Sequence, residues 1–179
     1  MLMTAEASQV LLVDMQERLL PAMANAEEVS ANAALVLHAA QALGVPVTLS
    51  VQYPQGLGPT VPALRQAAGG EPLEKIEFSC LRNPAIAGRL RGLGRRQLVV
   101  AGVEAHVCVL QSVIDARDEG FEVFVVADAT GSRKPESRER AMARMAAAGA
   151  QVVTAEMAVF EWLERADSPR FRELSKLVR

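Results

Sequence analysis

The 179-residue sequence has few of the side chains that build disulfide frameworks, metal centres or stacking surfaces for nucleic acid. Two cysteines and two histidines are too few for a disulfide scaffold and give no cluster of metal ligands. Aromatic residues make up only 4% of the chain, and 19 basic side chains face 21 acidic ones. With no basic excess and few aromatic rings, nucleic acid is a poor candidate partner.

Long hydrophobic runs are also missing. The first apolar run, residues 10–13, ends at Asp14. It is too short for the core of a signal peptide, and far short of the roughly 20 residues that span a bilayer. The two cysteines, Cys80 and Cys108, fit a reducing compartment. The sequence therefore predicts a cytoplasmic protein with no membrane partner.

Short apolar runs instead alternate with helical patterns along the whole chain. The predicted strands are residues 9–13, 45–51, 73–78, 97–101, 121–127 and 151–154. The predicted helices are residues 26–43 before Gly44, a helix starting at Asn83-Pro84, and residues 105–119, 135–148, 156–165 and 171–177. Residues 52–62, rich in Gly and Pro, are predicted as a loop. This alternation indicates one α/β domain, residues 1–179, with a three-layer α/β/α, Rossmann-like arrangement and a six-stranded parallel sheet.

Three reactive side chains fall near predicted strand ends, where open parallel sheets bind their ligands. Asp14 follows the first strand, Lys75 lies in the third, and Cys108 lies in the first turn after the fourth. Taken singly, these are commonly a turn residue, a solvated lysine and a small core residue. Together they supply a proton acceptor, a cation and a thiol whose pKa a helix start would lower. The turn at residues 102–108 adds backbone N–H groups for an oxyanion, which completes the set for acyl transfer.

Four stretches resemble the isochorismatase-like cysteine hydrolases, a family that includes nicotinamidase and N-carbamoylsarcosine amidase. They are LLVDMQ (residues 11–16), EKIEFS (74–79), VAGVEAHVC (100–108) and VVADATGSR (125–133). They occur in the family's order over almost the whole chain.

The resemblance implies a catalytic triad of Asp14, Lys75 and Cys108. It also implies a cis peptide bond between Val103 and Glu104, and an oxyanion hole made by the backbone N–H groups of Glu104 and Cys108. One departure is Ala105, where many relatives carry Thr, so a supporting hydroxyl contact is missing.

The subgroup of the family bears on cofactor and substrate. Nicotinamidase-type relatives hold a metal ion with an Asp-x-His and a further His after the second strand, whereas residues 52–59 here contain neither His nor carboxylate. We therefore predict a site without metal or other cofactor, which argues against nicotinamide. The isochorismate-cleaving members lack the cysteine, so Cys108 argues against that chemistry. The expected activity is cleavage of a small amide-like molecule at a C–N bond through a Cys108 thioester.

Other residues carry weaker expectations. Gln16, Tyr53 and Phe78 are candidate pocket residues, with Gln16 also suited to fixing the loop after the first strand. Cys80 is predicted to serve packing only, and His106 a structural or exposed role. Asp128, Ser132 and Arg133 are expected to hold the turn after the fifth strand.

Two further features bear on assembly. The loop at residues 53–62 and the apolar residues Phe160, Trp162 and Leu163 exceed what a monomer needs to cover its sheet. Because relatives of the family are commonly oligomeric, we expect a homo-oligomer, a dimer or larger.

Two other function classes compete with the hydrolase. A phosphohydrolase with Asp14 as nucleophile needs a second carboxylate two residues later, and position 16 is Gln. A cysteine phosphatase needs an Arg six residues after the Cys, and position 114 is Ile. A catalytically silent α/β binding or assembly module remains an alternative, although all three triad residue types are present. No Gly-x-Gly-x-x-Gly follows the first strand, which disfavours a dinucleotide-binding domain.

Overall fold

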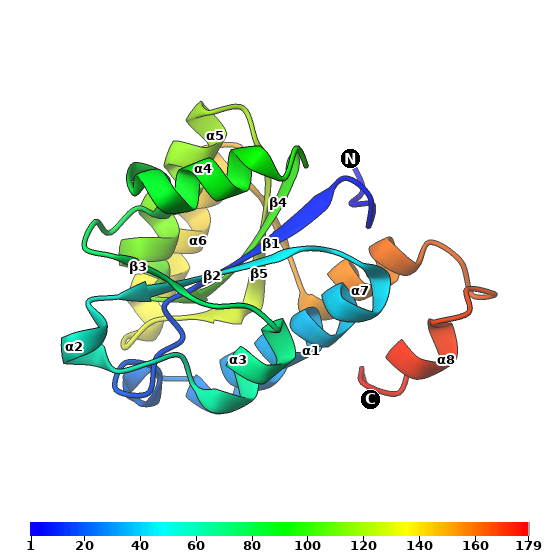
Figure 1. Cartoon of the computed structure of the whole chain (residues 1–179), viewed down its shortest axis with the longest axis horizontal. Helices are drawn as coiled ribbons and strands as arrows, with labels where there is room; N and C mark the ends of the chain where they lie inside the picture. Colours follow the sequence, from blue (N-terminus) through cyan, green and yellow to red (C-terminus); the bar gives the residue numbers. More distant parts are fainter. Residues whose placement is uncertain (179) are drawn as a thin grey trace.

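A computed structural model describes residues 1–178 and shows a sheet covered by helices on both faces (Figure 1). The six strands pair in parallel in the order β3-β2-β1-β4-β5-β6. Their bounds are β1 Ser8–Val13, β2 Val47–Gln52, β3 Leu73–Lys75, β4 Gln97–Val103, β5 Glu122–Gly131 and β6 Gln151–Val153. The predicted α/β fold class is confirmed, and strand order reverses between β1 and β4.

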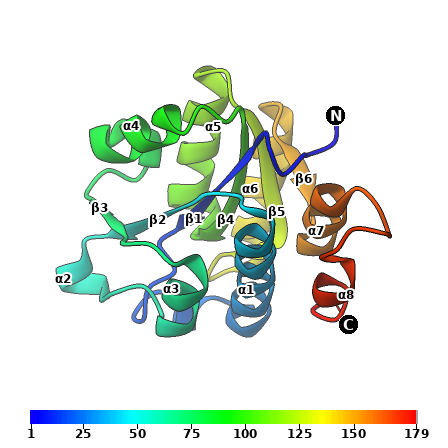
Figure 2. The same cartoon turned by 45° about the vertical axis from the view of Figure 1, so that its right-hand side comes forward.

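The helices form the two outer layers (Figure 2). One face carries α1 (Ala26–Leu43), α3 (Pro62–Ala68) and α7 (Ala155–Leu163), and the other carries α4 (Pro84–Gly92), α5 (Leu110–Asp118) and α6 (Pro135–Ala147). Shorter pieces are α2 (Pro54–Leu57), α8 (Phe171–Leu174) and the turns η1 (Leu20–Ala22), η2 (Cys80–Arg82) and η3 (Ala105–Val109). Within residues 1–178, no helix combines the length and the apolar character that crossing a bilayer requires.

Burial of the central strands on both faces explains their uninterrupted apolar sequences. In β1, Val10 and Leu12 pack into the core under α1, while Leu11 and Val13 pack into the core under α5. Strands buried on both faces lose the alternation of polar and apolar residues, as expected for a parallel sheet. Helix α1 has the predicted bounds and ends at Gly44, whose φ of 70° fits a left-handed C-cap.

The outer strand β3 and the segment after β2 differ from expectation. β3 ends at Lys75 rather than at residue 78, and the chain then leaves the sheet with Ile76 81% exposed. Within the predicted loop at residues 52–62, Pro54 starts the short helix α2. Helix α3 follows and was not predicted, because the small and polar residues of its segment carry little apolar periodicity.

Two residues expected at an interface between subunits lie inside this chain. Trp162 and Leu163 are 3% and 5% exposed, and the Trp162 indole N–H donates to Ser8 Oγ at 2.9 Å. They cover the sheet itself, because α7 turns them inward. Phe160 stays 39% exposed and packs its ring against Phe171, 6.3 Å away between centroids.

Gly102 allows the closest approach between β1 and β4. It pairs with Val13, has a φ of +124°, and would place an added Cβ only 2.1 Å from the Val13 carbonyl oxygen. No side chain fits there without separating the two strands. Since Asp14 follows Val13 directly, this contact also fixes the start of the loop that carries Asp14.

We expect Gly102→Ala to lower the free energy of unfolding by about 3 kcal/mol or more, because the methyl group overlaps backbone atoms. Gly44→Ala is the matched control, since Gly44 also has a positive φ but no atom within 4 Å of an added Cβ. It should lose only about 1–2 kcal/mol. Urea denaturation of both variants measures the difference, and equal losses would contradict the close-approach argument.

Candidate active site

The carboxyl ends of four neighbouring strands bring the predicted residues together. Asp14 follows β1, and Lys75 is the last residue of β3. The register sets Val13 beside Ser50 and Gln52 beside Lys75, so β2 lies between the two charged residues. Cys108 comes from the turn after β4, on the other side of β1. All three predicted triad residues therefore lie at the same edge of the sheet.

Asp14 and Lys75 form a fully buried ion pair. Lys75 Nζ lies 2.8 Å from Asp14 Oδ2, and both side chains are 0% exposed. The Ser50 hydroxyl donates to Asp14 Oδ1 at 2.8 Å, so both carboxylate oxygens are engaged. Burial by itself lowers the pKa of Lys75, but the Asp14 charge, the smaller influences of Cys80 and Cys108 and the Asp14 hydrogen bond together leave that pKa raised. Lys75 is therefore a cation here.

Two further oxygens complete the surroundings of the Lys75 ammonium. It donates to Gln52 Oε1 at 2.6 Å and, more weakly, to the Glu77 carbonyl at 3.3 Å. Together with Asp14, these acceptors match the three N–H bonds of an ammonium group. The positive charge is thus fixed in place by donated hydrogen bonds on three sides.

Cys108 lies in a π-helical turn, not in a regular helix start. Turn η3 is closed by the Val109 N–H, which donates to the Glu104 carbonyl at 3.2 Å. Such turns are frequent at functional sites. The Cys108 carbonyl accepts from Ser112 Oγ at 2.7 Å, and its sulfur lies 3.9 Å from Gln52 Oε1. At 6% exposure, the thiol is nearly covered.

The pKa of the Cys108 thiol is raised, whereas the sequence predicted a lowered one. Burial raises the pKa of this thiol, and the Asp14 carboxylate raises it further, while Lys75 lowers it by less. The sequence predicted a lowered pKa from the helix start and the lysine, but it could not show the depth of burial. The resting thiol is therefore neutral, with a charged carboxylate beside it.

The turn between β4 and Cys108 holds the predicted oxyanion residues. The Val103–Glu104 peptide bond is cis, as the family resemblance implied. The Glu104 carboxylate is bound by Arg133, whose backbone N–H and Nε lie 3.2 and 3.0 Å from Oε2. Arg133 thereby ties this turn to the segment after β5.

The candidate pocket residues lie in different positions. Tyr53 and Phe78 are 56% and 54% exposed. Tyr53 lines a surface hollow of about 370 Å³, whose lining includes Lys75 but not Asp14, Cys108 or Phe78. The other residues that line it are Pro54, Gln55, Glu74, Ile76, Glu77 and Asn83.

Gln16 supports the site from behind and is not placed to line it. Its side chain donates to the carbonyls of Gln52 and Gly58 at 2.9 and 2.7 Å, and it accepts from the Gln52 N–H at 2.8 Å. Because Gln16 is also fully buried, its amide has no surface to offer a substrate. The sequence predicted that Gln16 fixes the loop after the first strand, and its hydrogen bonds join that loop to the end of β2 and to the segment after it.

Gln52 is the site residue that sequence reasoning missed. It contacts both Lys75 and Cys108, yet a neutral amide at a strand end matches no catalytic pattern. One signal could have found it. Gln52 opens the stretch that corresponds to the metal-binding segment of the nicotinamidase-type relatives, where a polar side chain faces the same site.

The residues expected to be structural lie in hydrogen-bonded positions, but Asp128, predicted in the turn after the fifth strand, lies inside β5, which runs to Gly131. Cys80 is fully buried, and its thiol donates to Ser50 Oγ at 3.5 Å, while its N–H donates to Ser112 Oγ at 2.8 Å. Burial, and then the Asp14 charge, raise the pKa of the Cys80 thiol. At the far side of the site, His106 Nδ1 lies 2.9 Å from Ser132 Oγ. The Asp128 carboxylate accepts from a backbone N–H at the start of α7.

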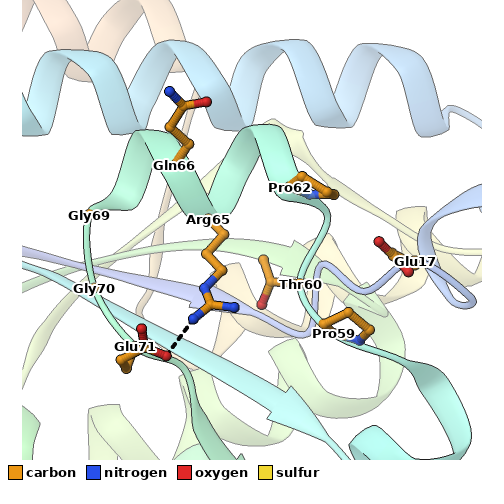
Figure 3. Close-up of a pocket in the computed structure, with 9 residues that line it drawn as sticks. All are labelled: Glu17, Pro59, Thr60, Pro62, Arg65, Gln66, Gly69, Gly70 and Glu71. Carbon is orange, nitrogen blue, oxygen red and sulfur yellow. Dashed lines mark hydrogen bonds and ion pairs between the residues drawn. The ribbon is translucent and has the colours of Figure 1, made fainter.

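A separate hollow of about 510 Å³ lies beside α3 and contains none of the triad (Figure 3). Figure 3 shows the ion pair between Arg65 and Glu71, two of the residues that line this hollow. The atoms Arg65 Nη2 and Glu71 Oε2 lie 2.6 Å apart. Among residues 1–178, no group of three or more His, Cys, Asp or Glu side chains is arranged to hold a metal ion.

Comparison with known proteins identifies the family. Residues 8–157 match the Isochorismatase domain. The mouse isochorismatase domain-containing protein 2A is 38% identical over 175 residues, which cover 97% of this chain and 84% of the mouse protein.

Solved structures show the same fold. The MAR1 ribonuclease of Caenorhabditis elegans superposes with a TM-score of 0.93 at 31% identity, covering 99% of this chain and 92% of that one. The YcaC product of Escherichia coli, an octameric hydrolase of unknown specificity, gives 0.93 at 28%, covering 98% and 88%. YcaC from Pseudomonas aeruginosa, seen with hexane-2,5-diol and covalent acrylamide, gives 0.90 at 29%, covering 99% and 95%. With its domain match, its close relatives and its parallel sheet all in agreement, the chain belongs to the isochorismatase family and has the fold of its hydrolases.

Proposed function

We propose that this protein is a cysteine hydrolase that cleaves a small amide-like substrate at a C–N bond, through a thioester on Cys108 and without a metal ion. One observation carries the proposal. The Asp14–Lys75 ion pair is fully buried, and Gln52 Oε1 links it to Cys108, because this oxygen lies 2.6 Å from the Lys75 ammonium and 3.9 Å from the Cys108 sulfur. Carboxylate, cation and thiol in one water-poor site are the groups that acyl transfer needs.

The first half of the reaction forms the thioester. Asp14 removes the Cys108 proton as the sulfur attacks the substrate carbonyl carbon, so the thiolate exists only as the C–S bond forms. The carbonyl oxygen becomes an oxyanion, which the N–H groups of Glu104 and Cys108 stabilise. Loss of one such donor costs roughly 3–4 kcal/mol in comparable enzymes. Asp14 then gives its proton to the leaving amine, and the C–N bond breaks.

The second half releases the acid and restores the thiol. Asp14, again a carboxylate, takes a proton from water as the water oxygen attacks the thioester carbonyl. The resulting tetrahedral species expels the Cys108 sulfur, which recovers its proton from Asp14. Lys75 stays protonated throughout, and its charge offsets whichever of Asp14 or Cys108 carries the negative charge.

Two of the relatives support this chemistry, one by its described activity and the other by a covalently bound molecule. The E. coli protein is described as a hydrolase, and the P. aeruginosa protein holds covalently attached acrylamide. Acrylamide is an electrophile that adds to thiols, so a reactive cysteine in this chain is the natural counterpart. The C. elegans protein is described as a ribonuclease, but this chain carries no excess of basic side chains to bind RNA.

The environment of Asp14 disfavours the phosphohydrolase alternative. Lys75 and Ser50 occupy its two oxygens. A carboxylate held in this way suits proton transfer to and from a neighbour better than attack on phosphorus. Position 16, where that chemistry needs a second carboxylate, carries the Gln16 amide bound to backbone. A silent binding module would not need a buried charge pair beside a thiol, since such pairs are costly to bury.

Cys108→Ser should abolish turnover in a screen of small amides, ureides and esters run with a chelator, because the hydroxyl is too weak an acid for Asp14 to ionise. Wild-type protein quenched during turnover should gain the mass of the acyl group on the Cys108 peptide. Cys80→Ser, the matched control, should retain measurable activity. Near-normal turnover by Cys108→Ser would exclude the thioester and favour Asp14 as nucleophile. RNA belongs in the same screen as a substrate of another class.

Alkylation of Cys108 by iodoacetamide should be slow at neutral pH and should accelerate by about tenfold per pH unit above it. The reason is that burial and Asp14 raise the thiol pKa, so the reactive thiolate is a minor species whose fraction grows with pH. Peptide mapping should find Cys108 labelled before the fully buried Cys80. A rate that is already at its plateau at pH 7 would indicate a preformed thiolate and contradict the raised pKa.

We propose that the protein is a homo-oligomer. Tyr53, Ile76 and Phe78 expose apolar surface beside the site, and Phe160 does so on α7. The E. coli relative is octameric. Light scattering at micromolar concentration should give a dimer or larger assembly, and replacing Ile76 with Asp should weaken it. A monomer at that concentration would overturn the proposal.

A further inference from the structure

We infer that Gln52 is a positioning residue: its side-chain oxygen occupies one N–H of the Lys75 ammonium and keeps that N–H from the Cys108 sulfur, so that the thiol stays neutral until substrate is bound. The inference deepens the proposed function, because it rests on Cys108 being the nucleophile. It assigns to Gln52 control over when the thiolate forms. Neither the sequence motifs nor the triad itself accounts for this residue.

Every donor of the Lys75 ammonium is occupied. An ammonium group has three N–H bonds. They are directed to Asp14 Oδ2 at 2.8 Å, Gln52 Oε1 at 2.6 Å and the Glu77 carbonyl at 3.3 Å. Gln52 provides the shortest of the three contacts. With all three donors occupied, no N–H of Lys75 is left to stabilise a thiolate.

The amide group of Gln52 cannot flip. Its amide nitrogen donates to the Ile76 carbonyl at 2.7 Å, while its oxygen accepts from Lys75. A flipped amide would place an NH₂ group against the ammonium and an oxygen against a carbonyl. Gln16 also holds the backbone N–H and carbonyl of Gln52. The oxygen is therefore fixed between the ammonium and the sulfur.

Neighbouring titratable groups decide whether the Cys108 sulfur is a thiol or a thiolate. The titratable groups that influence Cys108 are Asp14, Lys75 and Cys80. Asp14 and Cys80 disfavour the thiolate, and Lys75 is the one that favours it. The Gln52 oxygen, 3.9 Å from the sulfur, is the partial negative charge that competes with a thiolate for Lys75. Removing this oxygen should therefore release the one favourable interaction.

The functional gain is that the thiol reacts with its substrate and stays unreactive in its absence. A permanent thiolate reacts readily with peroxides and other electrophiles, whereas a buried neutral thiol reacts slowly. Asp14 remains charged and able to accept the proton when a carbonyl carbon comes within reach of the sulfur. Gln52 thus lowers adventitious reactivity at no cost to the proton transfer that turnover requires.

The test measures iodoacetamide alkylation of Cys108 between pH 6 and 10, which needs no knowledge of the substrate. Gln52→Met keeps the length of the side chain but removes the oxygen. One Lys75 N–H is then free to turn to the sulfur, so alkylation at pH 7 should be about tenfold faster, a shift of one pKa unit. Gln52→Glu places a full negative charge at the same point and should slow alkylation below the wild-type rate.

Gln55→Met is the matched control, because it makes the same change on the exposed helix α2. It should leave the profile at the wild-type position. Alkylation of folded Gln52→Met at or below the wild-type rate would overturn the inference. If Gln52→Met does not fold, Gln52→Glu decides alone, and a rate equal to or above wild type overturns it. These readouts involve no turnover. If Cys108→Ser is inactive and Gln52→Met leaves the alkylation profile unshifted, the proposed function stands and the inference about Gln52 fails.

Discussion

The buried ion pair between Asp14 and Lys75 is the contact on which the rest of the site depends. Removing two charges from water costs several kcal/mol per ion, and their attraction repays this only where the remaining hydrogen bonds are satisfied. Here Ser50 serves the carboxylate, and Gln52 and the Glu77 carbonyl serve the ammonium. These partners come from β2 and from the segment after β3. The pair can exist only if β1, β2 and β3 keep their mutual register, so the sheet edge and the site form one structure.

This pair also sets the charge balance of the proposed reaction. At rest the site holds one carboxylate, one ammonium and a neutral thiol, which sum to zero. Moving the proton from sulfur to carboxylate leaves a thiolate beside the same ammonium, and the sum is unchanged. Charge is therefore moved over a short distance inside a preorganised site and is not created there. In a site shielded from water this matters, because new isolated charge would carry a large solvation penalty.

Much of the fold could be predicted because its signals are local. Helix α1 shows both an apolar stripe and a glycine stop, and β1 and β4 are apolar runs bounded by polar residues. The triad positions followed from strand ends and from the family resemblance. β3 was drawn too long because charged residues in an edge strand look the same inside the sheet and beyond it. The exposed and buried members of α7 were confused for a related reason, since an apolar residue does not reveal which face it occupies.

The least predictable features depend on how deeply a side chain is buried and on contacts between segments that are distant in the sequence. The state of Cys108 follows from how far its sulfur lies from water, and no local pattern encodes that distance. Gln52 acquires its importance only when β2 and β3 align and bring its oxygen to Lys75. Similarly, the three hydrogen bonds of Gln16 join segments that are separate in sequence. Residue type could suggest the triad, but only the assembled sheet could reveal what surrounds it.

Ser112 has a consequence for how such a protein can acquire new specificities. Its hydroxyl accepts from the Cys80 N–H and donates to the Cys108 carbonyl, so it locks the chain after Phe78 to the turn that carries the nucleophile. Both links are made through backbone atoms. The exposed side chains at Ile76 and Phe78 can therefore be exchanged over evolutionary time without releasing the nucleophile from its place. In the proposed reaction, Cys108 would therefore keep its position while these exposed side chains change.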